Sequence, residues 1–254
     1  MTIGIIGLGI VGQAVATGLC EISDMDLKLL VSERTREKSA ALAARYPEKV
    51  EVSEDNQDIV DRADWVVLAV LPKQAEEVLA GLRFHEGQKF ISLVPTLSLK
   101  RASELTGLTQ VFDVLPMPFC AKHLGPVAMN PGDEEIGAVL NRMGTLVVAQ
   151  SADEMACFRT VTCLMSAYYQ LLAKSQELFT DAGASPENAE AYIASFFEAL
   201  AVQAQVRPES LQGLALEMTP GGLNHYIWSH LGEAGMYDLW KKLMGDVLAR
   251  VKKD

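Results

Sequence analysis

Three glycines near the start of the chain have the type and spacing that can hold a diphosphate. Gly7, Gly9 and Gly12 form a G-x-G-x-x-G pattern between the β-branched run of residues 3–6 and a helical stretch over residues 13–19. In such a strand–turn–helix unit the first glycine permits the tight turn, the second admits the pyrophosphate and the third lets helix and strand pack closely. The free N–H groups that begin the helix attract the phosphates. We therefore expect a dinucleotide to bind at Gly7, Leu8, Gly9, Ile10, Val11 and Gly12.

The residues after the second predicted strand, 27–31, bear on which dinucleotide binds. An acidic residue here clamps the ribose hydroxyls of NAD, whereas a basic residue receives the 2′-phosphate of NADP. Glu33 offers the first arrangement. Hydroxyl groups and arginines are donors of the right type for the second, and the chain supplies Ser32, Arg34, Thr35 and Arg36. The pattern favours NADP and leaves NAD possible.

No other group of reactive side chains has the spacing of a known kind of site. The cysteines lack C-x-x-C spacing and the histidines lack H-E-x-x-H spacing, so no metal site is expected. Cys120 and His123 lie on one loop, but a nucleophile pair also needs a third group that orients the histidine. The sequence shows no such group, and we interpret the pair as neighbours by chance.

Strand and helix patterns alternate over the first ~150 residues, which is typical of a mostly parallel sheet. Residues 65–70 are apolar throughout, as expected of a central strand that is buried on both faces. The expected strands are residues 3–6, 27–31, 50–52, 65–70, 90–94, 110–115, 127–129 and 146–148, and the expected helices are residues 37–46, 74–82 and 133–142.

From residue 151 the chain is predicted to be all helical. Ser151 and Glu154 form a capping box, and residues 155–182 contain neither Gly nor Pro before Gly183 ends the helix. This helix is apolar on nearly every side, which indicates burial between two subunits. Further helices are expected over residues 185–205, 208–216 and 236–252.

These patterns predict an α/β fold class with two domains. A Rossmann-type doubly wound sheet is expected over residues 1–150, followed by an all-helical dimerisation domain over residues 151–254.

Composition argues against several classes of partner. The formal net charge of −11 disfavours nucleic acid and anionic membranes, because both attract a basic face. No apolar run approaches the ~20 residues of a membrane span, and no basic, apolar leader is visible. The four cysteines lack C-x-x-C spacing, and we interpret them as reduced thiols. We expect a cytoplasmic protein that acts on a small molecule as a homodimer or higher homo-oligomer.

Four segments, in order and spacing, resemble the pyrroline-5-carboxylate reductase family. The first is residues 5–12, which contain the glycines. Residues 63–72 are similar to the family's aspartate, apolar strand and V-K-P turn. Residues 114–117 correspond to M-P-N, and residues 219–224 correspond to T-P-G-G-T-T. Residues 177–183 also match the family's glutamate-to-glycine helix end, so the resemblance runs roughly end to end.

The resemblance implies an N-terminal Rossmann domain and a C-terminal helical dimerisation domain, with the active site between domains of two subunits. It also implies that a cyclic imine is reduced by hydride transfer from NAD(P)H. The turn after the fourth strand would complete the cofactor site with Ala69, Val70, Leu71 and Pro72.

The substrate half of the chain departs from the family pattern. Leu71 replaces the V-K-P lysine, Met117 replaces the asparagine of M-P-N, and residues 165–171 replace S-G-S-G-P-A-Y. Leu223 and Asn224 replace the final threonines. We therefore expect weak or no activity with pyrroline-5-carboxylate, and a preference for a more apolar imine or ketone. The substrate-binding residues that the resemblance implies are Met117, Gly221, Gly222, Leu223 and Asn224.

Reduction of an imine also needs a proton donor. The candidates are Tyr168, Asn224 and His225, with Tyr169 and Tyr226 beside them. A histidine is attractive because it changes charge near neutral pH. Each aromatic side chain could instead pack at a helix interface, and Asn224 could instead be a helix N-cap.

Two other functions remain open from the sequence. One is a dinucleotide-binding dimer without catalysis, such as a redox sensor, because altered substrate residues can mean a lost substrate. The other is an oxidoreductase that uses a deazaflavin, which related Rossmann proteins bind.

Overall fold

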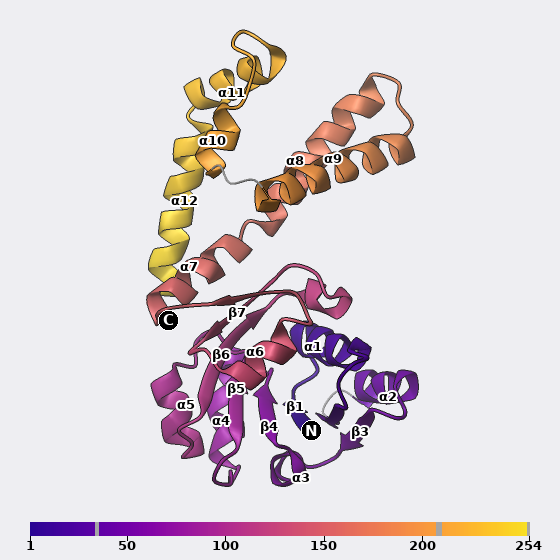
Figure 1. Ribbon diagram of the computed structural model, residues 1–254, viewed down its shortest axis with the longest axis vertical. Helices are drawn as coiled ribbons and strands as arrows, with labels where there is room; N and C mark the ends of the chain where they lie inside the picture. Colours follow the sequence, from indigo (N-terminus) through magenta and orange to yellow (C-terminus); the bar gives the residue numbers. More distant parts are fainter. Residues whose placement is uncertain (34–35, 207–209, 253–254) are drawn as a thin grey trace. The chain divides into compact units, whose positions relative to one another are not determined.

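The chain folds as two compact units that divide between Phe158 and Arg159. The structure is a computed structural model that describes residues 1–33, 36–206 and 210–252, and Figure 1 shows it as a ribbon. The predicted boundary lies at residues 150–151, just before helix α7 (Ala152–Thr162) begins. We call the first unit the sheet unit and the second the helical unit.

The sheet unit contains an eight-stranded sheet in the order β3-β2-β1-β4-β5-β6-β7-β8, as far as the described residues go. Every neighbouring pair runs parallel except β6 and β7, which run antiparallel. The winding direction reverses between β1 and β4, which is where α/β sheets of this kind bind ligands. The strands are β1 (Thr2–Ile6), β2 (Lys28–Ser32), β3 (Val50–Ser53), β4 (Trp65–Leu68), β5 (Lys89–Ser92), β6 (Val111–Pro116), β7 (Pro126–Asn130) and β8 (Thr145–Val148).

Helices cover both faces of this sheet because alternate strand residues point to opposite faces. Ile3 and Ile5 belong to one buried cluster, and Ile6 belongs to the other. The first cluster includes residues of α1 (Ile10–Glu21), α2 (Arg36–Arg45) and α6 (Glu134–Leu140). The second includes residues of α3 (Asn56–Arg62), α4 (Ala75–Ala80) and α5 (Leu99–Thr106). Short 3₁₀ helices, η1 (Pro72–Gln74) and η2 (Pro118–Lys122), follow β4 and β6.

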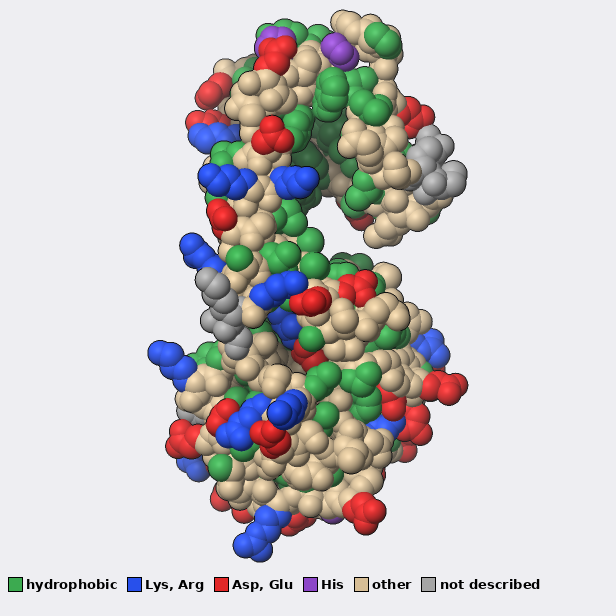
Figure 2. All heavy atoms as spheres, turned by 90° about the vertical axis from the view of Figure 1, so that its left-hand side faces the viewer, with side chains coloured by type: hydrophobic (Ala, Val, Ile, Leu, Met, Phe, Trp, Pro, Cys, Tyr) green, Lys and Arg blue, Asp and Glu red, His purple; other side chains and the backbone are tan. Residues whose placement is uncertain are grey.

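The helical unit leaves most of its apolar side chains exposed. Within its described residues, only Thr160, Ala189 and Ile193 are buried. Figure 2 shows hydrophobic side chains gathered on its surface. Its helices after α7 are α8 (Met165–Asp181), α9 (Pro186–Val206), α10 (Leu211–Leu216), α11 (Leu223–Glu233) and α12 (Met236–Val251).

The predicted fold class is confirmed, with a mostly parallel doubly wound sheet followed by helices. The single helix predicted over residues 155–182 is wrong, because α7 ends at Thr162 and α8 begins at Met165. At the break, the amides of Cys163 and Leu164 bond three residues back rather than four, which tightens the turn. Thr162 Oγ1 also donates to the Arg159 carbonyl at 2.7 Å, an alternative partner that competes with helix bonding.

Sequence reasoning missed three helices, α3, α5 and α11. The first two contain only 7 and 8 residues, which is too short for a clear apolar repeat. Each nevertheless has a side-chain N-cap, Asp55 for α3 and Ser98 for α5, and these caps are the signal that could have found them. Across the described residues, no helix is long and apolar enough to cross a membrane.

Candidate functional site

The glycine loop borders a hollow of 510 Å³ at the carboxyl ends of β1 and β4. Because this is the switch point of the sheet, it is the expected position of a bound ligand. The lining residues come from three separate segments of the sheet unit: Gly7, Leu8, Gly9, Ile10, Val11, Ala69, Val70, Leu71, Gln74 and Leu93.

The three glycines of the motif have different local surroundings. Gly7 has φ +103°, and a Cβ there would lie 2.6 Å from the Ala69 carbonyl oxygen. A Cβ on Gly12 would lie 2.1 Å from the Gly7 carbonyl oxygen, so this position must stay bare for α1 to pack on the loop. A Cβ on Gly9 would meet nothing within 4 Å. The open space at Gly9 is what the approach of a diphosphate requires.

Helix α1 begins at Ile10 without a side-chain cap, and Gly9 is its N-cap. Its first helical hydrogen bond runs from the Gln13 N–H to the Gly9 carbonyl at 3.0 Å. The amides before Gln13 therefore lack helical partners and carry the positive end of the helix dipole. These groups suit an anion such as a diphosphate.

A second hollow, of 620 Å³, lies at the carboxyl ends of β2 and β3. One wall is polar and charged, and the opposite wall is largely apolar, from the end of α4. The lining residues are Glu33, Arg36, Glu54, Asp55, Asn56, Val78, Gly81 and Leu82. A surface of this kind can receive a flat base on its apolar side and a ribose on its polar side.

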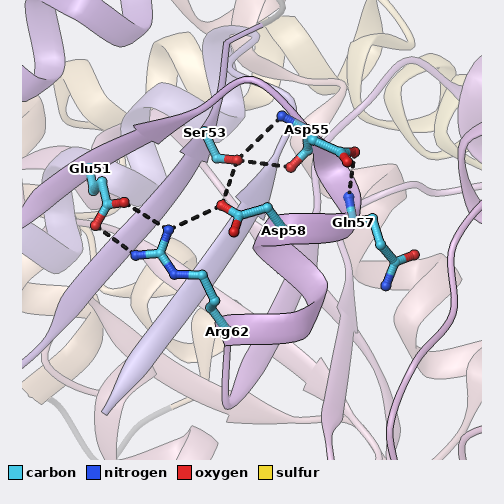
Figure 3. A network of polar contacts seen from close by, with 6 residues as sticks. All are labelled: Glu51, Ser53, Asp55, Gln57, Asp58 and Arg62. Carbon is cyan, nitrogen blue, oxygen red and sulfur yellow. Dashed lines mark hydrogen bonds and ion pairs between the residues drawn. The ribbon is translucent and has the colours of Figure 1, made fainter.

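The polar wall is held by a network at the end of β3, drawn in Figure 3. Ser53 Oγ donates to Asp58 Oδ2 at 2.8 Å and accepts from the Asp55 N–H at 3.3 Å. The hydrogen bond from Ser53, with the Arg62 guanidinium, holds the pKa of Asp58 below its ordinary value. Arg62 also bonds both carboxylate oxygens of Glu51 at 2.7 Å and lowers the pKa of that carboxyl.

Ser32 links the end of β2 to the glycine loop. It is buried at the end of β2, and its Oγ accepts the Gly7 N–H at 2.9 Å. Its hydroxyl therefore supports the glycine loop. The predicted phosphate residues Arg34 and Thr35 lie outside the described residues.

Most of the predicted turn after β4 reaches the glycine-loop hollow. Ala69, Val70 and Leu71 line it, whereas Pro72 begins η1 and is not among the lining residues. Sequence reasoning missed Gln74 and Leu93, which also line the hollow. Leu93 follows β5, so its place at the carboxyl edge was the available signal.

The predicted substrate and proton-donor residues fall in both units. Met117 is the N-cap of η2 in the sheet unit. Tyr168 lies on α8 in the helical unit, where its ring packs edge-on against Phe197 with centroids 5.8 Å apart. The association of Met117 and Tyr168 in one site stays a prediction.

The glycine turn begins α11 in the helical unit. Gly221 has φ +76°, and Gly222 is the N-cap of α11, so the alternative interpretation of Asn224 as the N-cap is wrong. Leu223 is 85% exposed, and Asn224 and His225 lie in the first turn of the helix. The His225 ring lies 5.8 Å from that of Trp228.

Cys120 and His123 support the packing of η2 on α1. Cys120 is fully buried, and burial raises the pKa of its thiol to about 11, which makes it a poor nucleophile. His123 Nε2 donates to the Gly18 carbonyl at 2.9 Å. A Cβ on Gly18 would lie 2.5 Å from the Cys120 carbonyl oxygen, which shows how closely η2 packs on α1. Packing therefore accounts for Cys120 and His123, and no catalytic role is needed to explain them.

Comparison with known proteins is consistent with this geometry. The family described as NADP oxidoreductase coenzyme F420-dependent matches residues 2–96. The pyrroline-5-carboxylate reductase of Mycobacterium tuberculosis is 27% identical over 197 residues, which are 71% of this chain and 64% of that protein. That of Treponema pallidum is 26% identical over 207 residues, covering 79% and 71%. A crystal structure of the Streptococcus pyogenes enzyme aligns with 100% of this chain and 99% of its own, with a TM-score of 0.84 at 20% identity.

The chain is similar to the pyrroline-5-carboxylate reductases at low sequence identity, and it shares the fold of the Streptococcus pyogenes enzyme. The family match over residues 2–96 contains every residue that lines the two hollows. Met117, Tyr168 and the turn at residues 221–224 lie beyond it. The likeness to reductases is therefore most direct where a cofactor would bind.

Proposed function

We propose that the protein is an NADPH-dependent reductase that transfers a hydride to the C=N bond of a small imine, with a carbonyl compound as the alternative substrate. The observation that carries this proposal is the glycine-loop hollow, with its open space at Gly9 and the free amides of α1 above it. The names of the curated relatives, which reduce pyrroline-5-carboxylate, point to the same reaction class.

The residues present fit a nicotinamide dinucleotide. The amides of the Gly9–Gly12 segment would hold its pyrophosphate, and the residues of the second hollow would receive its adenosine end. When bound, the nicotinamide supplies the hydride. The protein contributes binding, orientation and exclusion of water, for which the apolar Leu71 and Leu93 line the glycine-loop hollow. NADP is favoured over NAD because the Plasmodium falciparum relative with a TM-score of 0.82 is described with NADP bound.

For the substrate, we propose two groups of candidate residues, each within one unit: Met117 in the sheet unit, and Tyr168 with the turn Gly221, Gly222, Leu223 and Asn224 in the helical unit. The adjacent glycines leave N–H groups that can receive an anionic or carbonyl group. Asn224, Tyr168 or His225 would hold or deliver the proton. The apolar side chains at positions 117 and 223 favour a more apolar substrate than an imino acid.

We propose a homodimer assembled through the helical unit. Exposed apolar side chains on several of its helices support this, because large exposed apolar areas are typical of surfaces that other proteins cover. The side chains include Leu178, Tyr192, Phe196, Leu200, Val206, Leu211, Tyr226, Ile227 and Leu239. The free state of all four cysteines is consistent with a cytoplasmic location.

The test combines binding with turnover. Calorimetry with NADPH and NADH comes first, and NADPH oxidation is then followed with pyrroline-5-carboxylate and with larger apolar cyclic imines. We expect NADPH binding, turnover of an apolar imine, and a kcat/KM for pyrroline-5-carboxylate below the usual enzyme range of about 10⁴–10⁸ M⁻¹s⁻¹. A value within that range would show that the altered substrate residues do not matter.

Two controls separate the alternative functions. Tight NADPH binding without turnover of any imine or ketone would indicate a non-catalytic sensor. Oxidation of a reduced deazaflavin by NADP would indicate the third function, and this arm is included because the matching family is named for coenzyme F420.

A further inference from the structure

An ion pair stands where the adenosine ribose of a dinucleotide would bind. Arg36 Nε donates to Glu33 Oε1 at 2.7 Å, and both residues line the second hollow. The side chain of Arg36 is 79% exposed, whereas that of Glu33 is 26% exposed. The arginine is therefore accessible to a ligand but already has a carboxylate partner.

The backbone fixes both members of this pair. The Glu33 N–H donates to the Ser53 carbonyl at 3.0 Å, which ties Glu33 to the end of β3. Arg36 begins α2, and its carbonyl accepts the Ser39 hydroxyl at 3.1 Å. The pair is formed by side-chain atoms alone, so exchange of Arg36 for another partner requires only side-chain rotation.

The polar wall also contains two further carboxylates and the neutral Asn56. Glu54 and Asp55 line the same hollow, and Asp55 caps α3 by accepting the Gln57 N–H at 2.9 Å. A 2′-phosphate carries about −1.5 to −2 charges near neutral pH, as phosphate monoesters do. It would meet carboxylates here as well as a guanidinium. A ribose diol carries no charge and can donate hydrogen bonds to Glu33.

We propose that Glu33 and Arg36 form a selector for the cofactor, in which Glu33 withholds Arg36 from the 2′-phosphate of NADPH and can itself bind the ribose hydroxyls of NADH. The pair therefore lowers the ratio of NADPH affinity to NADH affinity, so that NADH can also bind. This inference rests on the proposed function, because it requires a dinucleotide in the second hollow. It adds the residues that set the choice between the two cofactors.

The experiment measures dissociation constants for NADPH and NADH by calorimetry at one fixed ionic strength. Glu33→Gln removes the charge that holds Arg36, so the preference for NADPH should rise about tenfold, the scale of one charge-assisted hydrogen bond. Arg36→Ala frees Glu33 and should lower that preference about tenfold. Glu54→Gln is the matched control, because it removes a charge from the same hollow without breaking the pair, and should change the preference less than about threefold.

The double variant Glu33→Gln with Arg36→Ala completes the cycle. If the two residues act as a pair, the change in the NADPH-to-NADH affinity ratio in the double variant will differ from the product of the changes in the two single variants. Circular dichroism confirms that each variant is folded.

Several outcomes overturn the inference. Weaker NADPH binding by Glu33→Gln would mean that Glu33 positions Arg36 for the phosphate. An unchanged preference, or one equal to that of Glu54→Gln, would mean that the pair does not select. If the wild type binds neither NADPH nor NADH, the proposed function and this inference both fail. If the wild type binds both cofactors but the variants keep its preference, only this inference fails.

Discussion

The two units of this protein bury their apolar side chains to very different extents. The sheet unit encloses two large buried clusters, one on each face of the sheet. The described residues of the helical unit include only three that are buried. Since hydrophobic burial is the main favourable term in folding, we expect the sheet unit to draw most of its stability from its own core, and we expect the helical unit to gain stability from the proposed dimer. If the proposed cofactor site and the proposed dimer surface are right, they lie in different units, and a mutation can change one without the other.

The largest expected effect concerns cofactor binding in the sheet unit. Gly9→Asp places a side chain and a negative charge where the pyrophosphate must approach, so NADPH affinity should fall more than about 100-fold, to the limit of detection. The fold should survive, because a Cβ on Gly9 meets nothing within 4 Å. Calorimetry measures the loss, and circular dichroism provides the control. Unchanged affinity would show that the diphosphate binds elsewhere.

The second prediction concerns assembly through the helical unit. Light scattering should give about twice the chain mass of 27.6 kDa, on the usual two-fold symmetry. Glu substitution of both Phe196 and Leu200, which are each 50% exposed on α9, should produce a monomer. Gln205→Glu adds a charge to the opposite face of α9 without removing apolar surface and should leave the dimer intact. A wild type that is monomeric at micromolar concentration would contradict the dimer.

The third prediction separates Gly12, which packing requires to lack a side chain, from Gly9, which we propose faces the diphosphate. Gly12→Ala should lower the free energy of unfolding by about 1–3 kcal/mol, the usual range for overpacking, because its Cβ would lie 2.1 Å from the Gly7 carbonyl oxygen. Gly9→Ala should change it by less than about 0.5 kcal/mol. Urea unfolding of both variants provides the comparison. An equal decrease in the free energy of unfolding in both variants would mean that the whole loop, and not Gly12 alone, is intolerant of a side chain.

The smallest effect concerns an ion pair that joins β5 to α6. Lys89 Nζ lies 2.8 Å from Asp133 Oδ1 and 2.8 Å from Glu135 Oε2. Burial by itself raises the pKa of Asp133, but the Ile136 N–H and the Lys89 ammonium outweigh it and leave the pKa below its ordinary value. A carboxyl with a lowered folded pKa stabilises the protein above the unfolded pKa of about 3.9, and this contribution is lost as the pH falls through the folded pKa.

Asp133→Asn should therefore lower the free energy of unfolding by about 1–2 kcal/mol at pH 7. The difference from the wild type should shrink below about pH 4 as the native carboxyl protonates. Glu135→Gln, at a side chain that is 73% exposed, should change stability by less than about 0.5 kcal/mol. An Asp133→Asn effect that is the same at pH 7 and pH 3 would show that packing, not charge, is responsible.

Local patterns were sufficient to predict much of the sheet unit. The G-x-G-x-x-G spacing located the loop that borders the first hollow, because the motif is built from consecutive residues with fixed backbone demands. The apolar run at residues 65–70 located β4 (Trp65–Leu68) in the interior of the sheet. The unbroken apolar pattern of residues 155–182 could not reveal the break between α7 and α8, because side-chain polarity does not report a change in backbone hydrogen bonding.

The sequence by itself determined which segment can face a diphosphate and that the chain changes from α/β to helical character near residue 151. Only the tertiary structure decided that Ser32 supports Gly7, and that the second hollow joins Glu33 and Arg36 to residues 54–56 and to Val78, Gly81 and Leu82. These neighbours are separated along the chain and meet because parallel strands bring their carboxyl ends to one edge of the sheet. Their distances depend on the register of the strands and the packing of both helical layers, which no local pattern specifies.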